Sequence, residues 1–383
     1  MQKKKIFLAM IEAGGGHKSP AQATEEAFNE LFPRKFDVIV PDFTKYVGAI
    51  ELDKTHKKSW QFLLSKPLLS MSAYYFQDIF EDVSKAYVKQ WMKEFVEKGC
   101  EWFKNNYLDV FVSYHFLNTM VAVEAKKRFN LLFPVVSYLT EPMDAHGMWV
   151  LPDTDYKVVS SQIAKMDLIA RGFPIEKIVV IPYLVKPSFL KISAKREDII
   201  EDLGLDTNKK TVIISSGAEG LGKVESFSME IIKKNLPVNL IVVCAKNKEL
   251  KEKLDKFKES YHGDTNIIVK GYVTNMNELI SVSDICAVKA SPGSTFEALF
   301  LNKIVIHTQY VTPSEKANTD YILREQIGFY TPTKMGFINT VKSLVENQVL
   351  YDEYRERIKA QGFKTGAYDM AKFIANLAVG RTL

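Results

Sequence analysis

A histidine directly after a run of glycines is the first place in this sequence where residue types and spacing point to chemistry. The motif Gly14-Gly15-Gly16-His17 follows a short apolar run, and Ser19 and Gln22 form a capping-box pattern around Pro20. This pattern predicts that a helix begins at Ser19, with backbone N–H groups free to meet a phosphate or another oxygen-rich ligand. A tight strand-to-helix turn would also use glycine, but it would not need three. Because histidine titrates near neutral pH, His17 is a candidate base.

A second glycine loop surrounds Gly217 and Gly220 and again follows an apolar run directly. Gly217 and the pair Gly222-Lys223 have the spacing of a Walker A motif. The residue that would bind magnesium through a hydroxyl is Val224, which has none. An ATPase is therefore the weaker interpretation, and we favour a turn that closely approaches a ligand.

A third loop, residues 289–299, contains Pro292-Gly293-Ser294-Thr295 and opens a predicted helix. Its N–H groups and the hydroxyls of Ser294 and Thr295 suit a diphosphate. Ser294 and Glu297 also have capping-box spacing, which would give Glu297 a purely local role. Both interpretations stay open at this point.

The elements that must position these loops are short apolar runs rich in Val and Ile, separated by helical patterns. Such runs predict parallel strands with both faces covered, and hence doubly wound α/β folding. The expected strands are residues 5–11, 36–40, 108–113, 133–139, 156–160, 178–181, 211–215, 239–244, 266–269, 285–288 and 304–307. Ligands of such sheets bind beyond the carboxyl ends of the strands, where all three loops lie.

A chain of 383 residues is long enough for two domains with separate cores. Two prolines interrupt the pattern at residues 181–187. We therefore expect an N-terminal domain over 1–185, a C-terminal domain over 186–364, and a final helix within 365–383 that packs back on the first domain. The catalytic cleft is expected between the two domains.

Composition excludes several classes of protein. The net charge of +5 is too diffuse for nucleic-acid binding, although it suits an anionic membrane surface or ligand. The three cysteines are not in a CxxC arrangement, which favours a reducing cytoplasm and no structural metal. No stretch reaches the ~20 apolar residues that cross a bilayer, so any membrane contact is expected to be peripheral.

Several stretches together resemble the MurG-like glycosyltransferases, and within them the diacylglycerol glycosyltransferases. The resemblance covers residues 5–330 and implies a GT-B fold of two Rossmann-like domains. Its segments are Gly14-Gly15-Gly16-His17, residues 136–141 with His146 and Trp149, residues 185–189, residues 271–276, and residues 289–299 with Glu315 and Asn318.

The resemblance implies roles for individual residues. His17 would be the catalytic base or the group that orients the acceptor hydroxyl, and Glu141 would be a second catalytic residue. The acceptor would be held by Gly14, Gly15, Gly16, His115, His146 and Trp149. The donor, a UDP-sugar, would be held by Gly217, Gly220, Tyr272, Val273, Pro292, Gly293, Ser294, Thr295, Glu297, Ser314, Glu315 and Asn318. Such enzymes invert the anomeric centre, and neither a metal nor another cofactor is expected.

This sequence departs from the family pattern at three of these positions. Glu141 stands where relatives usually have aspartate, Ser291 replaces the first glycine of Gly-Pro-Gly, and Ser314 replaces a glutamine beside Glu315. The last difference puts the identity of the donor hexose in doubt.

An aromatic segment over residues 60–76, flanked by Lys57, Lys58 and Lys66, is predicted to lie at a membrane interface and to admit a lipid. A helical cover on the core is the alternative. Val83, Tyr87, Trp91 and Phe95 recur every four residues, which predicts a buried helix face. No motif or spacing around His56, His262 or His307 indicates a functional role.

The resulting hypothesis is an inverting hexosyltransferase that transfers from a UDP-sugar to diacylglycerol or a glycosyl-diacylglycerol at the inner face of the cell membrane. Two alternatives remain: a UDP-N-acetylglucosamine-dependent transferase acting on a prenyl-linked or other lipid, and a non-catalytic nucleotide-sugar-binding protein. A glycosidase is disfavoured because no two carboxylates are paired by their spacing.

Overall fold

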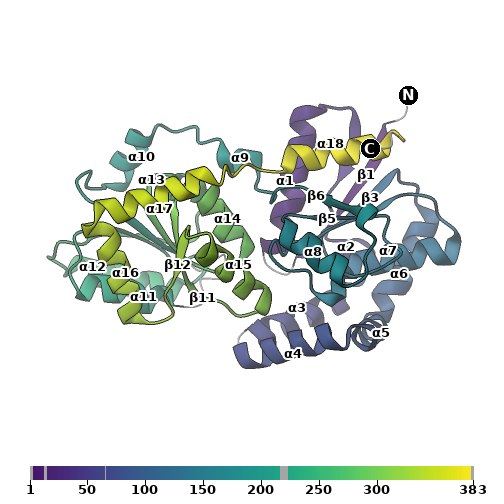
Figure 1. Ribbon diagram of the computed structural model, residues 1–383, viewed down its shortest axis with the longest axis horizontal. Helices are drawn as coiled ribbons and strands as arrows, with labels where there is room; N and C mark the ends of the chain where they lie inside the picture. The colour runs from purple at the N-terminus through teal and green to yellow at the C-terminus, as the bar shows by residue number, and fades with distance from the viewer. Residues whose placement is uncertain (1–2, 13–14, 65, 216–222, 381–383) are drawn as a thin grey trace. The chain divides into compact units, whose positions relative to one another are not determined.

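The computed structural model describes residues 3–12, 15–64, 66–215 and 223–380, which form two compact α/β units (Figure 1). The first unit contains Met1–Pro187, Val311–Ser314 and Thr365–Leu383, and the second contains Ser188–Tyr310 and Glu315–Lys364. Among the described residues, no helix is both long enough and apolar enough to span a membrane.

The first unit is built on a parallel sheet in the order β2-β1-β3-β4-β5-β6. Its strands are β1 (Lys4–Ala9), β2 (Phe36–Ile39), β3 (Val110–Ser113), β4 (Val135–Tyr138), β5 (Tyr156–Val159) and β6 (Ile178–Val180). Its helices are α1 (Gly15–Leu31), α2 (Phe43–Tyr46), α3 (Ile50–Leu64), α4 (Pro67–Ile79), α5 (Glu81–Trp91), α6 (Lys93–Asn105), α7 (Phe116–Phe129), α8 (Gln162–Ala170) and α18 (Ala367–Ala378), with the short 3-10 helices η1 (Gly147–Trp149) and η2 (Ile175–Lys177).

The second unit repeats the plan with a parallel sheet in the order β12-β11-β10-β7-β8-β9. Its strands are β7 (Thr211–Ser215), β8 (Asn239–Val243), β9 (Asn266–Lys270), β10 (Ile285–Lys289), β11 (Ile304–Gln309) and β12 (Gly328–Tyr330). The helices of this half of the chain are α9 (Pro187–Leu190), α10 (Arg196–Leu203), α11 (Val224–Lys233), α12 (Lys248–Glu259), α13 (Met276–Val282), α14 (Pro292–Phe300), α15 (Pro313–Arg324), α16 (Lys334–Glu346) and α17 (Gln348–Ala360).

Every strand expected from the sequence is present, within one or two residues at each end. The strand that the sequence did not reveal is β12, a three-residue edge strand that begins at Gly328. A strand this short contains no run of β-branched residues, so the apolar pattern cannot indicate it.

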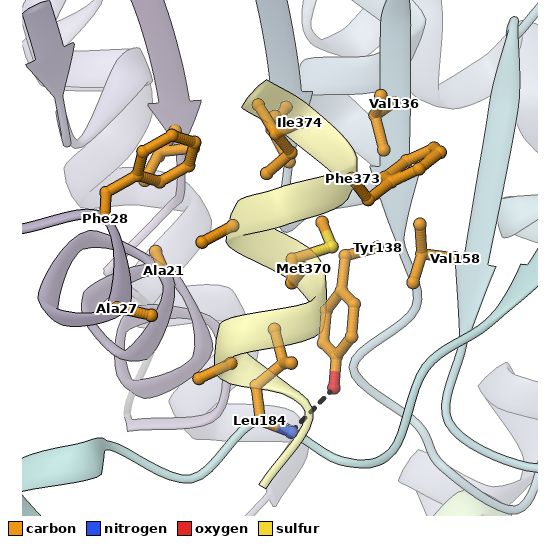
Figure 2. Packing of buried hydrophobic residues seen from close by; sticks show 14 of the residues in the cluster. Ala21, Ala27, Phe28, Val136, Tyr138, Val158, Leu184, Met370, Phe373 and Ile374 are labelled. Atoms are coloured by element: carbon orange, nitrogen blue, oxygen red, sulfur yellow. Dashed lines mark hydrogen bonds between the residues drawn. The ribbon is translucent and has the colours of Figure 1, made fainter. Parts of the chain in front are cut away.

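The two faces of the first sheet are covered by different helices. Ile6 and Leu8 of β1 pack with α1 and α18, whereas Phe7 and Ala9 pack with α6 and α7. In Figure 2, Met370, Phe373 and Ile374 of α18 lie among side chains of α1 and of the strands. The last described helix of the chain therefore completes the core of the first unit.

The capping box predicted at Ser19 is wrong, because α1 already includes Gly15 and Gly16. Proline at position 20 is tolerated this close to the start of a helix, since it costs only the bond to the carbonyl of Gly16. The box predicted at Ser294 is also wrong: α14 begins at Pro292, and its N-cap is Ser291.

The prediction that Val83, Tyr87 and Trp91 form a buried face is also wrong. Val83 and Tyr87 are 63% and 69% exposed, and Trp91 is exposed as well. Helix α5 ends at Trp91 and buries Ser84 and Val88 instead. Phe95 is buried, but it belongs to α6, so the four-residue spacing crosses a helix boundary.

Candidate active site

The site in the first unit lies where the order of its strands reverses. β1 has β2 on one side and β3 on the other, so the loops that follow β1 and β3 diverge at the carboxyl edge of the sheet. Ligands of doubly wound sheets bind at such a point. His17 comes from the segment after β1, and His115 from the segment after β3.

His17 is held in one tautomer by the backbone. Its Nδ1 lies 2.7 Å from the carbonyl oxygen of Tyr114, which can only accept a hydrogen bond. Nδ1 therefore carries the hydrogen, and Nε2 keeps the lone pair. Burial lowers the pKa of His17 to about 4, against the opposing effect of the bond to Tyr114. At neutral pH His17 is an uncharged imidazole with Nε2 as its basic atom.

Glu141 follows β4 and lines the same cavity as His17. Burial raises the pKa of Glu141 to about 7, although hydrogen bonds to Thr140 and Trp149 partly oppose this shift. The hydroxyl of Thr140 donates to Oε2 of Glu141 at 3.0 Å and lies 3.4 Å from Nδ1 of His17. Thr140 thus connects the two groups that the sequence predicted to be catalytic.

The cavity has a volume of about 210 Å³ and a largely apolar wall. Helices α3, α4 and α5 contribute Trp60, Leu63, Ala73 and Trp91 to this wall. The cavity also brings together the predicted site residues His17, Glu141, His115, His146, Trp149 and Ser314. The cavity thus combines polar and ionisable groups with a largely apolar wall, which suits an acceptor with a hydroxyl and hydrocarbon chains.

His115 and His146 both use a ring nitrogen to cap a helix. Nδ1 of His115 accepts from the N–H of Leu117 at 3.2 Å, and its ring centroid lies 4.5 Å from that of His17. Nδ1 of His146 accepts from Met148 at 3.2 Å, while its Nε2 donates to the carbonyl of Tyr74 at 3.1 Å. With both nitrogens engaged by backbone, His146 joins α4 to η1 and offers a ligand only its ring.

Gly15 and Gly16 are exposed in the first turn of α1, and a Cβ at either position would meet no atom within 4 Å. Packing therefore does not require glycine here, and the open space leaves the backbone accessible to a ligand. Gly14 lies outside the described residues, as do Gly217 and Gly220 of the second glycine loop.

His56 lines the cavity although the sequence did not single it out, and Tyr74, from the aromatic segment 60–76, lines it too. The ring of His56 lies 6.0 Å from that of His115 and 5.9 Å from that of Trp91. A signal was present: His56, Trp60 and Leu63 share one helix face by their spacing of four and three residues, and all three line the cavity.

Ser314 belongs to the first unit, where it meets a tyrosine and a carboxylate. Its hydroxyl lies 2.8 Å from that of Tyr74 and donates to Oδ2 of Asp144 at 3.1 Å. Tyr74 also donates to Asp144, and burial with this carboxylate raises the pKa of Tyr74. The sequence predicted that Ser314 holds the donor, but it did not indicate these contacts with Tyr74 and Asp144.

In the second unit, the strand order reverses between β7 and β10. The loop after β10 leads into α14, where Pro292, Gly293 and Ser294 are partly exposed and present the start of the helix. Thr295 is different: its side chain is buried, and its hydroxyl donates to the carbonyl of Ser291 at 2.8 Å. Any contact of Thr295 with a phosphate would therefore involve its backbone rather than its hydroxyl.

Glu315 and Asn318 are attached to the same loop from α15. Nζ of Lys289 lies 2.5 Å from Oε1 of Glu315, and the amide of Asn318 donates to the carbonyl of Ala290 at 3.0 Å. Lys289 is therefore a residue of this site that the sequence reasoning did not assign.

The remaining predicted donor residues lie elsewhere in the second unit. Glu297 is half-buried on α14, while Tyr272 is 65% exposed and Val273 half-buried between β9 and α13. Within the described ranges, no group of three or more His, Cys, Asp or Glu side chains could hold a metal ion.

Known proteins resemble this chain in sequence and in fold. Residues 17–182 match the family model described as monogalactosyldiacylglycerol (MGDG) synthase. The chain is 26% identical over 355 residues to a monogalactosyldiacylglycerol synthase of Spinacia oleracea, a match that covers 88% of this chain and 65% of that protein. The chain thus spans just under two thirds of the length of this relative.

Solved structures show the same fold at low identity. MurG of Acinetobacter baumannii aligns with a TM-score of 0.61 and 12% identity, covering 98% of this chain and all of that one. UGT71G1 of Medicago truncatula, solved with UDP-glucose, aligns with a TM-score of 0.62 and 11% identity, covering 98% of each chain. Together these matches confirm the GT-B fold and the resemblance to diacylglycerol glycosyltransferases that the sequence motifs indicate.

Proposed function

We propose that this protein is an inverting glycosyltransferase that transfers a hexose from a UDP-sugar to diacylglycerol or a glycosyl-diacylglycerol. The observation that carries the proposal is His17: a neutral imidazole, fixed in the Nδ1–H tautomer, that lines a largely apolar cavity. A base at this position can remove a proton from a hydroxyl group whose lipid chains occupy the apolar part.

In the proposed reaction, Nε2 of His17 takes the proton of the acceptor hydroxyl as its oxygen attacks the anomeric carbon. The new carbon–oxygen bond forms while the bond to the diphosphate breaks, and UDP leaves with the bonding electrons. The N–H groups at the start of α14 would stabilise the negative charge of the departing diphosphate. A cleft between the two domains stays a prediction.

Galactose is the first hexose to test, because the Spinacia relative is named as a monogalactosyldiacylglycerol synthase. The choice of hexose stays open, because Ser314 stands where relatives have glutamine and its hydroxyl already contacts Tyr74 and Asp144. UDP-glucose and UDP-N-acetylglucosamine are therefore needed as competing donors in the same assay.

We further propose peripheral contact with an anionic membrane on its cytoplasmic side. Leu68, Ile79, Val83 and Tyr87 on α4 and α5 are 63–83% exposed, and we call these four side chains the α4–α5 apolar face. Lys58 and Lys66 are exposed nearby in sequence. Lys57, predicted to flank the membrane segment, instead pairs with Asp42 and Asp53 at 3.0 and 2.7 Å.

The test is radiolabelled transfer from each of the three UDP-sugars into vesicles of diacylglycerol and phosphatidylglycerol, and into a total lipid extract. We expect labelled diacylglycerol from wild type and a loss of roughly 10²–10⁴-fold for His17→Ala, because the base is removed. His262→Ala is the matched control, since His262 is an exposed histidine of the second unit.

Three outcomes would contradict the proposal. Transfer from UDP-N-acetylglucosamine alone, into a lipid other than diacylglycerol, would favour the alternative transferase. Thermal stabilisation by UDP without transfer from any donor would favour a non-catalytic binding protein. Equal activities of His17→Ala and wild type would remove the catalytic role from His17.

A further inference from the structure

A buried histidine in the second sheet connects the two helices to which the proposed function assigns the donor. His307 lies on β11 and has no exposed surface. Its Nε2 lies 2.9 Å from the hydroxyl of Thr295 on α14, and its Nδ1 lies 3.0 Å from the hydroxyl of Thr319 on α15. One imidazole ring therefore bridges α14 and α15 through the interior.

Each threonine hydroxyl also lies close to a carbonyl near the beginning of its own helix. The hydroxyl of Thr295 donates to the carbonyl of Ser291, the N-cap of α14, at 2.8 Å. The hydroxyl of Thr319 lies 3.3 Å from the carbonyl of Glu315. The chain of hydrogen bonds thus runs from the N-cap of α14, in the loop proposed to bind the diphosphate, to Thr319, which lies one helical turn after Glu315 on α15.

The number of available hydrogen atoms determines which group donates in each of these hydrogen bonds. Burial lowers the pKa of His307 to about 3, so the ring is neutral and carries one N–H. Thr295 donates to Ser291 over the shortest of the four distances, so it accepts from Nε2–H. Nδ1 then accepts from Thr319, whose contact with Nδ1 is shorter than its contact with Glu315.

Stability of the fold is a weak reason for a histidine at this position. Burying a polar ring costs free energy that its hydrogen bonds only offset, and an apolar side chain of similar size would avoid this cost. Without the ring, Thr295 and Thr319 would each keep the contact with a carbonyl of their own helix. What would be lost is the hydrogen-bonded connection between the two helices through the ring.

We propose that His307 is a positioning residue for the nucleotide-sugar, because it fixes the start of α15 relative to the start of α14. The inference rests on the proposed function, in which α14 holds the diphosphate, and it takes Glu315 of α15, one of the donor residues that the family resemblance implies, to hold the sugar. A second tie, from Asn318 to Ala290, joins the same two segments. A donor that uses both helices should therefore depend on His307 more than UDP, which lacks the sugar.

The test compares binding of UDP and UDP-galactose by calorimetry in wild type, His307→Leu, Thr319→Val and the double variant. We expect His307→Leu to weaken the binding of UDP-galactose by about tenfold and that of UDP by less than about threefold. Only the sugar requires α14 and α15 to be held in a fixed position relative to each other. Thr319→Val should give the same selective loss. The double variant should be no worse than His307→Leu, because both changes break one chain.

Ile306→Ala is the matched control, because Ile306 is buried on the same strand but does not contact α14 or α15 through this chain. Equal losses of UDP and UDP-galactose in His307→Leu, or the same selective loss in Ile306→Ala, would overturn the inference. If wild type binds both ligands but transfers no sugar, the proposed function fails while this inference is still decided by binding. If wild type binds neither ligand, both are overturned.

Discussion

Burial reverses the order in which a histidine and a glutamate lose their protons at the candidate site. The pKa of His17 falls to about 4 and that of Glu141 rises to about 7, because each loses water around its charged form. Between these values both groups are neutral, which suits a cavity that is otherwise apolar. A base that stays unprotonated well below pH 6.5 is available over the whole physiological range.

The raised pKa of Glu141 makes the stability of the first unit depend on pH. The pKa of Glu141 in the folded protein lies above its ordinary value of 4.5. The stability that depends on the protonated form of Glu141 is therefore fully present below about pH 4.5 and is lost as pH rises through about 7. We predict that the free energy of unfolding of the wild type falls by on the order of 2 kcal/mol between pH 5 and pH 8, and that Glu141→Gln does not show this fall.

The measurement is urea unfolding at pH 5 and pH 8, followed by tryptophan fluorescence. The four tryptophans, Trp60, Trp91, Trp102 and Trp149, all lie in the first unit, so the signal reports this unit alone. Glu176→Gln is the control, because Glu176 is exposed in the same unit. A wild-type pH dependence that persists unchanged in Glu141→Gln would assign it to other groups.

At the scale of elements, helices α3 to α5 form an insertion between β2 and β3 that serves two purposes. One side of these helices lines the cavity beside His17, and another exposes large apolar side chains. Exposed apolar groups of this size are uncommon on the surface of a soluble domain unless they bind something. The proposed membrane contact would place the mouth of a lipid-binding cavity close to its substrate.

We predict that Ile79→Ser and Val83→Ser each weaken binding to anionic vesicles by about tenfold, because each removes an apolar side chain that would enter the interface. Sedimentation with vesicles containing phosphatidylglycerol measures the loss. Met335→Ser is the matched control, since Met335 is 76% exposed but lies on α16 of the second unit. Unchanged binding of both Ile79→Ser and Val83→Ser, or equal weakening by Met335→Ser, would move the membrane contact to another surface.

At the scale of the whole molecule, the chain returns to its first unit after completing the second. Thr365 and the residues after it belong to the first unit, and α18 fills the face of the sheet beside α1 (Figure 2). The return is also tied by hydrogen bonds: Thr365 donates to the carbonyl of Val185 at 2.6 Å, and Tyr368 donates to Glu30 of α1 at 2.7 Å. The core that supports His17 is therefore not complete without α18.

We predict that Phe373→Ala and Ile374→Ala each destabilise the first unit by about 2–5 kcal/mol, because both side chains are buried against the sheet. Tryptophan fluorescence during urea unfolding detects this loss in the first unit. Lys372→Ala, on the exposed side of the same helix, should change stability little. Equal stability of Phe373→Ala and Lys372→Ala would mean that α18 contributes little to the core.

The sequence by itself determined the class of the fold. Runs of Val and Ile separated by helical patterns indicate buried parallel strands, and glycine-rich loops at their carboxyl ends indicate ligand sites in such sheets. This local information was sufficient for the strands β1 to β11 and for the family resemblance. It was insufficient for β12, whose three residues contain no pattern.

Only the tertiary structure decided what depends on a partner far away in the sequence. The tautomer of His17 is set by the carbonyl of Tyr114, and the bridging role of His307 is set by threonines on two different helices. The exposure of Val83 and Tyr87 depends on where α5 ends and on which side meets the core. Hydrogen bonds and burial are properties of neighbours in space, so spacing along the chain could not supply them.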